Sequence, residues 1–397
     1  MTRQIVLAID VGTTAIKVLA FEINSMACLG LVKKEISKKV EYDRVEQDPI
    51  EILNISIDLI RELVKKFELD INELVSIGIA NQRETTILWN KNTGRPIYNA
   101  IVWEDSRTQE WCNKQSNEVH EYIEKNTGLN LSSYFSATKI KWILENVEGA
   151  NEMVERGEIL FGTVDTWILW NLSREASHLT DWTNASRTLL FDSKTKYWSD
   201  ELLDIFNIPK CILPKILPSS SLFGHLRKNI LGVEIPILAV IGDQQASMFA
   251  AQQYCGKETG CTKITFGTGV FLMQIVGDDN IIHDPFYKTL AVNTEASDVV
   301  WALEYKIENI GREVSELLNR HDELERYLDR LTDKISVIVK QLPIKPSEII
   351  IDGGVTQNKY LHELLSEKID SKIIELSTYN GTSLGAALLS IKNKLKN

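Results

Sequence analysis

The chain begins with two short apolar runs that are separated by a turn of small residues. Residues 5–9 are all apolar and residues 16–23 are largely apolar, and Asp10-Val11-Gly12-Thr13-Thr14 lies between them. Two such runs joined by small residues predict a β-hairpin. Successive backbone N–H groups in the turn could form a concave binding site for a phosphate. A single hairpin of this type is more often purely structural.

The same pattern returns about 255 residues later. Residues 263–266 lead into Gly267-Thr268-Gly269, and residues 270–276 are again mostly apolar. The repetition predicts two related domains, each of which offers a phosphate-binding hairpin to a shared cleft. A third turn, Asp352-Gly353-Gly354, follows an apolar run and precedes a helical pattern over residues 357–369. Such a turn is either a plain β–α connection or a place where a ligand approaches the backbone.

Helices are predicted where apolar residues recur at spacings of three and four. Residues 49–67 and 136–147 show this spacing, with charged residues on the opposite face. Residues 314–342 are also helical in pattern, with a predicted break at residues 319–321.

The length of 397 residues exceeds what one hydrophobic core usually supports. We therefore expect two domains, residues 1–248 and 249–397, with the boundary shortly after the apolar strand at residues 235–241. A hydrophobic content of 44% and a charged content of 25% are ordinary values for a globular protein.

The net charge of −11 disfavours nucleic acid as a partner, because such proteins need a basic surface. Any nucleotide phosphate must then be held by local backbone groups, a metal and a few cations. The N-terminal residues are too soon interrupted by Asp10 for a signal peptide, and no long apolar span follows. We expect a cytoplasmic protein without a membrane span. The five cysteines show no paired metal-ligand spacing, which predicts reduced thiols with neither structural zinc nor a disulfide.

An arginine and a carboxylate stand side by side directly after the apolar residues 74–80. Arg83 can donate and Glu84 can accept hydrogen bonds, so together they could hold neighbouring hydroxyl groups of a small polyol. Trp103 could add an apolar wall against the carbon backbone. When an adjacent arginine and glutamate after a strand are considered alone, a surface ion pair is the commoner explanation.

Longer segments show that the chain resembles the FGGY family of carbohydrate kinases. The likeness is dense over residues 5–304 and returns over residues 352–387. Within the family, the chain is most similar to members that phosphorylate glycerol. The matching segments are Tyr-Phe-Ser-Ala-Thr-Lys-Ile-Lys-Trp-Ile-Leu-Glu-Asn at residues 134–146, Gly-Thr-Val-Asp-Thr-Trp at 162–167, Thr-Asn-Ala-Ser-Arg-Thr at 183–188 and Gly-Asp-Gln-Gln at 242–245.

The resemblance implies an α/β, actin/hexokinase-like fold of two ribonuclease-H-like domains with a central cleft. It implies an ATP-dependent phosphotransferase that uses Mg²⁺ and converts glycerol to glycerol 3-phosphate. A homo-oligomer is possible. Two alternatives stay open: a kinase for another small polyol or ketose, and a non-catalytic polyol-binding protein that has lost nucleotide turnover.

The resemblance also assigns site residues. Asp243 follows an apolar strand and is the expected general base for the attacking hydroxyl group. The expected polyol contacts are Arg83, Glu84, Trp103, Tyr134, Asp243, Gln244 and Phe271. The expected nucleotide contacts are Gly12, Thr13, Thr14, Lys17, Gly267, Thr268, Gly311, Gly354 and Asn358, and the expected metal-associated carboxylate is Asp10.

The chain departs from the family at three places. Lys17 stands where these kinases usually have arginine, so the cation keeps its charge but loses the bidentate fork. Only 40 residues separate Gly311 from Asp352, fewer than half of the family's number. Part of the second domain's sheet, or of the layer that covers it, is therefore predicted to be missing or rebuilt. A further helical tail of the family has no counterpart after residues 384–387.

Overall fold

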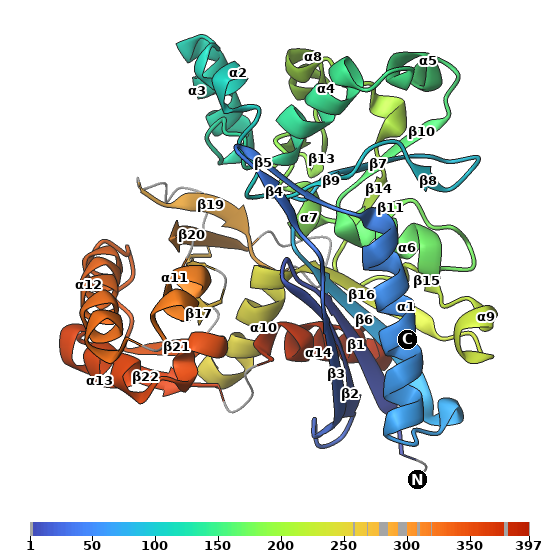
Figure 1. The fold of residues 1–397 in the computed structure, drawn as a ribbon. Helices are drawn as coiled ribbons and strands as arrows, with labels where there is room; N and C mark the ends of the chain where they lie inside the picture. The colour runs from blue at the N-terminus through green and yellow to red at the C-terminus, as the bar shows by residue number, and fades with distance from the viewer. Residues whose placement is uncertain are drawn as a thin grey trace. The chain divides into compact units, whose positions relative to one another are not determined.

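The chain forms two compact units in a computed structural model, which describes residues 3–256, 259–267, 269–277, 285–292, 300–307, 310–318, 320–376 and 380–396 (Figure 1). The first unit contains Met1–Asp243, Val292–Ser297 and Ala386–Asn397. The second contains Gln244–Ala291 and Asp298–Gly385. The units therefore change over at residue 243/244, whereas the sequence suggested a boundary at 248/249. The C-terminal residues group with the first unit instead of the second.

A six-stranded sheet forms the centre of the first unit. Its strand order is β15-β16-β6-β1-β2-β3. Strand β1 pairs antiparallel with β2, which confirms the predicted hairpin, and β6 and β16 extend the sheet in parallel. The strands are β1 (Ile5–Val11), β2 (Ala15–Glu22), β3 (Cys28–Glu35), β6 (Leu74–Asn81), β15 (Gly224–His225) and β16 (Pro236–Gly242).

Strand β1 is buried along its whole length because both faces of the sheet are covered. Helix α1 (Pro49–Lys66) begins after the N-cap Asp48, whose side chain accepts a hydrogen bond from Ile50 N. Its buried apolar residues recur at helical spacing and join the core with β1 and helix α6 (Val164–Leu172). The predicted helix over residues 49–67 is thus confirmed to within one residue.

The rest of the first unit consists of short elements: β4, β5 and η1 precede β6, and the others are inserted between β6 and β16. Residues 136–146 form helix α4, as predicted. The elements are η1 (Ile71–Glu73), β4 (Lys39–Glu41), β5 (Arg44–Gln47), β7 (Ile87–Asn90), β8 (Arg95–Pro96), β9 (Ala100–Ile101), α2 (Gln109–Asn113), α3 (Asn117–Thr127), α4 (Ser136–Asn146), α5 (Ala150–Glu155), β10 (Ile159–Gly162), β11 (Leu179–Asp181), α7 (Trp182–Ala185), β12 (Phe191–Asp192), β13 (Tyr197–Trp198), α8 (Asp200–Phe206), η2 (Lys210–Ile212), β14 (Lys215–Leu217) and α9 (Lys228–Leu231).

The second unit repeats the topology of the first. Its sheet has the order β19-β20-β18-β17-β21-β22, and β17 pairs antiparallel with β18 and parallel with β21. The run β20-β18-β17-β21-β22 therefore matches β3-β2-β1-β6-β16 in order and in direction. This repetition confirms the two ribonuclease-H-like domains. The strands are β17 (Thr262–Phe266), β18 (Val270–Ile275), β19 (Tyr287–Leu290), β20 (Trp301–Ile307), β21 (Glu348–Asp352) and β22 (Lys372–Glu375).

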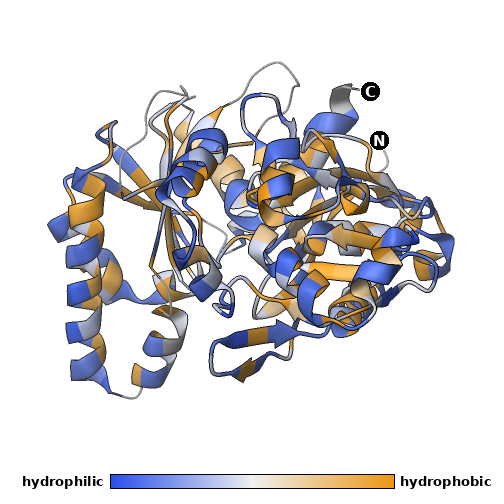
Figure 2. Cartoon of the chain, turned by 90° about the horizontal axis from the view of Figure 1, so that it is seen from above, coloured by the Kyte–Doolittle hydropathy of each residue, from blue (hydrophilic) through white to orange (hydrophobic). Residues whose placement is uncertain are grey.

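The short connection before β21 leaves this five-strand order intact. That part of the covering layer is missing or rebuilt stays a prediction. The predicted helical region is broken as expected, since α11 ends at Leu317 and α12 begins at His321; Asn319 lies outside the described residues. The helices from residue 243 to residue 396 carry both hydrophilic and hydrophobic residues (Figure 2). They are α10 (Asp243–Cys255), α11 (Ile310–Leu317), α12 (His321–Lys340), η3 (Gly354–Gln357), α13 (Lys359–Lys368) and α14 (Gly381–Lys396).

One expectation about the cysteines is wrong. Cys255 and Cys261 are paired as a disulfide, with their Cα atoms 6.1 Å apart. The two residues end α10 and precede β17, so the fold brings together cysteines whose spacing gave no sign of pairing. Cys28, Cys112 and Cys211 are free thiols. None of the helices within the described residues is long and apolar enough to cross a membrane.

We predict that Gly78→Ala destabilises the first unit. A Cβ atom at residue 78 in β6 would collide with the backbone carbonyl of Ala386 in α14. Backbone atoms cannot move aside as a flexible side chain can, so we expect a loss of roughly 3 kcal/mol in the free energy of unfolding. Denaturant unfolding measures this loss.

Gly94→Ala is the matched control. Gly94 has a φ of 67° and open space around its Cβ position, so this variant costs only the left-handed conformation, about 1–2 kcal/mol. An equal or smaller loss for Gly78→Ala would contradict the close packing of α14 on β6.

Candidate active site

The hairpin between β1 and β2 presents its turn to solvent. Gly12 N donates to Ala15 O at 3.2 Å and closes the turn, while Thr14 is exposed. Asp10, near the end of β1, lies opposite Lys17 of β2, and Lys17 Nζ is 3.5 Å from Asp10 Oδ2. The predicted metal-associated carboxylate and the predicted phosphate-binding cation are therefore neighbours.

Trp103 connects this turn to the predicted polyol residues. Its Nε1 donates to Thr13 Oγ1 at 2.7 Å, and Gln47 Nε2 donates to Thr13 O at 2.7 Å. The indole ring lies edge-on to the ring of Tyr134, with a centroid distance of 5.7 Å. Trp103 and Tyr134 are both buried, so they form one aromatic wall beside the hairpin.

Arg83 and Asp243 meet because they follow two neighbouring parallel strands. Asn81 ends β6 and Gly242 ends β16, and the two residues are paired in register. Arg83 Nε lies 3.5 Å from Asp243 Oδ1 and 3.7 Å from Glu84 Oε1. The side chains of Arg83 and Glu84 are almost fully buried, whereas that of Asp243 is 26% exposed. The carboxyl ends of parallel strands are the usual place for ligands in α/β sheets.

A second arginine, which the sequence analysis did not assign, completes this group. Arg187 Nε donates to Glu84 Oε1 at 2.6 Å, and neither side chain is accessible to solvent to a significant degree. The Arg187 guanidinium also lies over the ring of Tyr134, with Cζ 5.5 Å from the centroid. Lys139 Nζ donates to the carbonyl oxygen atoms of Glu84 and Tyr134. Both cations lie in segments quoted for the family resemblance, but their burial could not be inferred from the pattern.

Two further carboxylates are buried behind these residues. Asp165 accepts from Thr180 Oγ1 at 2.7 Å and from the Thr163 hydroxyl. Burial raises the pKa of Asp165 to about 7, and the nearby Asp181 charge acts in the same direction. Burial also raises the pKa of Asp181. Neither residue was among the sequence-predicted candidates.

The second unit holds the other predicted residues. Gly267 N donates to Gly269 O at 2.9 Å and closes the β17–β18 turn, while Thr268 lies outside the described residues. Phe271 is half-buried in β18, and Gln244 is buried in the first turn of α10.

The turn after β21 has open space next to a strained glycine. Gly353 has a φ of 103°, and a Cβ atom there would collide with the backbone of Phe266. At Gly354, by contrast, a Cβ atom would meet nothing within 4 Å. Asn358 Oδ1 accepts from Tyr360 N at 3.0 Å and caps α13, and Gly311 O accepts from Ser315 Oγ within α11. Asn358 thus has a structural role besides the predicted nucleotide contact.

Asp352, which ends β21, belongs to a buried ion pair that the sequence did not indicate. Lys263 Nζ lies 3.0 Å from Asp352 Oδ1, and the Ser247 hydroxyl donates to Asp352 Oδ2. The pair connects β17, β21 and α10. No group of three or more His, Cys, Asp or Glu residues able to hold a metal occurs within the described part of the chain.

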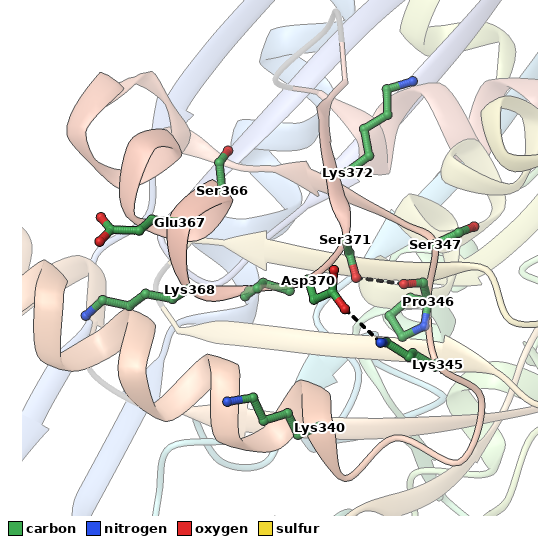
Figure 3. A pocket seen from close by; sticks show the side chains of 11 residues that line it. Lys340, Lys345, Pro346, Ser347, Ser366, Glu367, Lys368, Asp370, Ser371 and Lys372 are labelled. Atoms are coloured by element: carbon green, nitrogen blue, oxygen red, sulfur yellow. Dashed lines mark hydrogen bonds and ion pairs between the residues drawn. The ribbon is translucent and has the colours of Figure 1, made fainter.

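A cavity of about 910 Å³ in the second unit lies at the opposite end of β21 (Figure 3). Its lysines are largely neutralised: Lys345 pairs with Asp370 at 2.8 Å, Lys368 with Asp329 at 2.6 Å, and Lys372 Nζ is 3.3 Å from Glu348. None of the predicted site residues lines it. The lining residues are Lys340, Lys345, Pro346, Ser347, Ser366, Glu367, Lys368, Ile369, Asp370, Ser371 and Lys372.

The raised pKa of Asp165 predicts a pH dependence of stability. The ordinary value is 3.8 and the folded value is about 7, so between about pH 4 and pH 7 the folded state binds more protons than the unfolded state. The contribution of Asp165 to the free energy of unfolding therefore falls as the pH rises through this range. In Asp165→Asn the amide at residue 165 cannot titrate, so the variant does not show this fall in stability.

Urea unfolding of the wild type and of Asp165→Asn at intervals from pH 4.5 to pH 7.5 measures the effect. We expect the stability of the variant relative to the wild type to increase with pH. A constant difference across the range would contradict the assignment.

Comparison with known proteins identifies the family. The model of the "FGGY family of carbohydrate kinases, N-terminal domain" matches residues 5–250. A glycerol kinase of Aquifex aeolicus (strain VF5) is 50% identical over 289 residues, which are 72% of this chain and 57% of that protein. A glycerol kinase of Borreliella burgdorferi (strain ZS7) is 36% identical over 447 aligned positions, covering 97% of this chain and 88% of that protein. That alignment is longer than the 397 residues of this chain, so the relative contains segments that this chain lacks.

Solved structures agree with the sequence comparison. A Plasmodium falciparum glycerol kinase with ADP matches with a TM-score of 0.87 and 28% identity, over 100% of this chain and 90% of that chain. A gluconate kinase from Lactobacillus acidophilus matches with a TM-score of 0.82 at 18% identity, over 100% of this chain and 90% of that chain, and shows the shared fold alone. The fold is therefore actin/hexokinase-like, and the chain belongs to the FGGY family of carbohydrate kinases.

Proposed function

We propose that this chain catalyses the ATP-dependent phosphorylation of glycerol to glycerol 3-phosphate. The observation that carries the proposal is the convergence of Arg83, Glu84 and Asp243 beside the aromatic wall of Trp103 and Tyr134. The glycerol kinases among the relatives support glycerol as the polyol.

The polyol would be held by complementary groups. Arg83 can only donate hydrogen bonds and Glu84 can only accept them, so neighbouring hydroxyl groups find both kinds of partner. Trp103 and Tyr134 would cover the carbon atoms and exclude water. Because Arg187 holds Glu84 at 2.6 Å, the carboxylate is oriented before the substrate arrives.

Asp243 would act as the general base. The terminal hydroxyl oxygen of glycerol attacks the γ-phosphorus of ATP, its proton passes to the Asp243 carboxylate, and the bond from the γ-phosphorus to the bridging oxygen breaks, releasing ADP. Asp243 is the most exposed carboxylate of the group, and Arg83 Nε lies 3.5 Å from its Oδ1. This exposure supports Asp243, and not the buried Glu84, as the proposed base.

The nucleotide would be held by backbone groups. The turn that contains Gly12, Thr13 and the exposed Thr14 suits phosphates, as does the turn that begins at the half-buried Gly267, and Lys17 adds a positive charge. The open space at Gly354 suits the adenosine. Gly311 and Asn358 stay predicted contacts.

A Mg²⁺ ion fits the donor chemistry at Asp10. Its carboxylate oxygen atoms are hard ligands, and a Mg²⁺ ion that accompanies a nucleotide needs few protein ligands besides phosphates and water. When bound, the ion would neutralise phosphate charge. The homo-oligomeric state and the cytoplasmic location stay predictions.

We predict that Asp243→Asn lowers kcat by about 10²–10⁴-fold without unfolding the protein. The amide has nearly the same shape as the carboxylate but cannot take the proton. A coupled assay of ADP release with glycerol and ATP measures kcat, and the exposed Asp204→Asn on α8 is the matched control. More than half of the wild-type turnover in folded Asp243→Asn would remove Asp243 from this role.

We predict that Arg83→Ala weakens the binding of the polyol more than the binding of the nucleotide. The substitution leaves the substrate hydroxyl groups without the Arg83 donor in a buried site, while Arg187 still holds Glu84, a cost of roughly 1–3 kcal/mol. The KM for glycerol should rise about 5- to 150-fold, with little change in the KM for ATP. Equal losses for both would contradict the placement of the polyol.

The two alternative functions are separated by the same assay and by calorimetry. Turnover of a panel of small polyols and ketoses tests the choice of glycerol, since a higher kcat/KM for another acceptor would replace it. Calorimetry with glycerol and with a non-hydrolysable ATP analogue tests catalysis itself. Binding of glycerol without binding of the analogue would favour a non-catalytic protein.

A further inference from the structure

Asp181 is a buried carboxylate that the reaction itself does not use. It ends β11 and lies in the first unit, with no exposed surface. It accepts from Thr183 N at 2.9 Å, from Thr183 Oγ1 at 2.7 Å, from Asn184 N at 3.0 Å and from Asn184 Nδ2 at 2.8 Å. Ser219 Oγ donates to it at 2.6 Å. Backbone and amide N–H groups can only donate, so these partners suit an ionised carboxylate.

One arm of this network reaches the general base. The Thr183 hydroxyl donates a hydrogen bond to Asp181, and its oxygen accepts a hydrogen bond from Gly242 N at 2.8 Å. Gly242 is the last residue of β16 and directly precedes Asp243. A single side chain, that of Thr183, thus connects Asp181 to the backbone that carries the base.

A second arm reaches the polyol-binding pair. Asn184 Nδ2 donates to Asn81 Oδ1 at 3.1 Å, and Asn81 Nδ2 donates back to Asn184 Oδ1 at 2.9 Å. Asn81 Nδ2 also donates to Gln82 O at 2.8 Å, directly before Arg83. The reciprocal amide pair and the Asp181 contact fix the orientation of both amides. All of these side chains are buried.

Helix capping alone does not explain Asp181. It is the N-cap of α7, which has only four residues, and a serine or threonine could cap such a helix without burying a charge. Burying an ionised carboxylate among neutral groups is costly. That cost is understandable where one charged group must hold two separate segments.

We infer that Asp181 is a positioning residue that fixes the base Asp243 and the pair Arg83–Glu84 relative to each other. The inference rests on the proposed function, because it assigns the two arms to two steps of that reaction. Thr183 serves the proton transfer through Gly242. Asn184 and Asn81 serve the binding of the polyol.

The two arms can be cut separately. Thr183→Val removes the hydroxyl group but keeps the shape and the backbone contact to Asp181. We expect kcat to fall about 10- to 100-fold, with a smaller change in the KM for glycerol, because displacement of a reacting group by a fraction of an ångström is costly. Thr183→Ser, which restores the hydroxyl group, should recover most of kcat. Asn81→Ala should instead raise the KM for glycerol more than it lowers kcat.

Two variants control for a merely structural role. Ser219→Ala removes a hydrogen bond from the same carboxylate, and Asp165→Asn neutralises the neighbouring buried carboxylate, yet neither breaks an arm. Both should change the melting temperature without the separation of kcat from KM. Asp181→Asn should impair both parameters; if it does not fold, the Thr183 and Asn81 variants still decide the question.

The outcomes separate this inference from the proposed function. The contrary result, with an active wild type, is that kcat and KM change together in both Thr183→Val and Asn81→Ala, in proportion to the melting temperature alone. That result would overturn the inference and leave glycerol phosphorylation standing. Failure of Thr183→Ser to recover kcat would overturn the Thr183 arm. A wild-type chain that phosphorylates no polyol would overturn the proposed function and, with it, this inference.

Discussion

The candidate site depends on charges that are buried at the carboxyl ends of two neighbouring parallel strands. Arg83 and Glu84 follow β6, Asp243 follows β16, and Arg187 lies 2.6 Å from Glu84. A buried ion is tolerated only when it is paired and hydrogen-bonded, since removal from water costs several kcal/mol per ion. The two arginines pair with the two carboxylates, so the largely buried site can hold these charges. A dry site strengthens the hydrogen bonds to a polyol and keeps out water, which competes as an acceptor of the phosphoryl group.

The sheet supplies the rigidity that this arrangement needs. Strand β1 is buried on both faces, and β6 and β16 continue it in parallel, so the ends of these strands are fixed by the core. The turn after β1 then places Thr13 against Trp103 at 2.7 Å. The carboxyl ends of these strands therefore lie beside the predicted phosphate-binding turn, the aromatic wall and the proposed base. A substitution in the core, such as one at the contact of α14 with β6, would act on all three through the strand positions.

The sequence predicted much of this because the relevant signals are local. Hairpins, helix starts and the helix break at residues 319–321 depend on neighbouring residues, and the family resemblance placed Arg83, Glu84 and Asp243. The missed features depend on contacts that only the folded chain forms. The sequence pattern does not show that Arg187 is buried against Glu84, because the contact forms only in the folded chain. The Cys255–Cys261 pair likewise requires the end of α10 to lie next to the start of β17. The burial of Asp181 likewise depends on β11, β14 and β16 packing together.

The duplicated topology also bears on the predicted shortening of the second unit. Both units keep the same five-strand order, because removal of a central strand would expose unpaired backbone groups and the core beneath them. Most of the segment between Gly311 and Asp352 forms α11 and α12, and its last residues form β21. Helix α12 still buries an apolar face that includes Leu328 and Ile335, so the remaining layer is packed and not merely truncated. The segment that the resemblance predicts to be shortened therefore includes the helices at the predicted adenosine contact Gly311, while the strands beside the two glycine turns, β17, β18 and β21, are all formed.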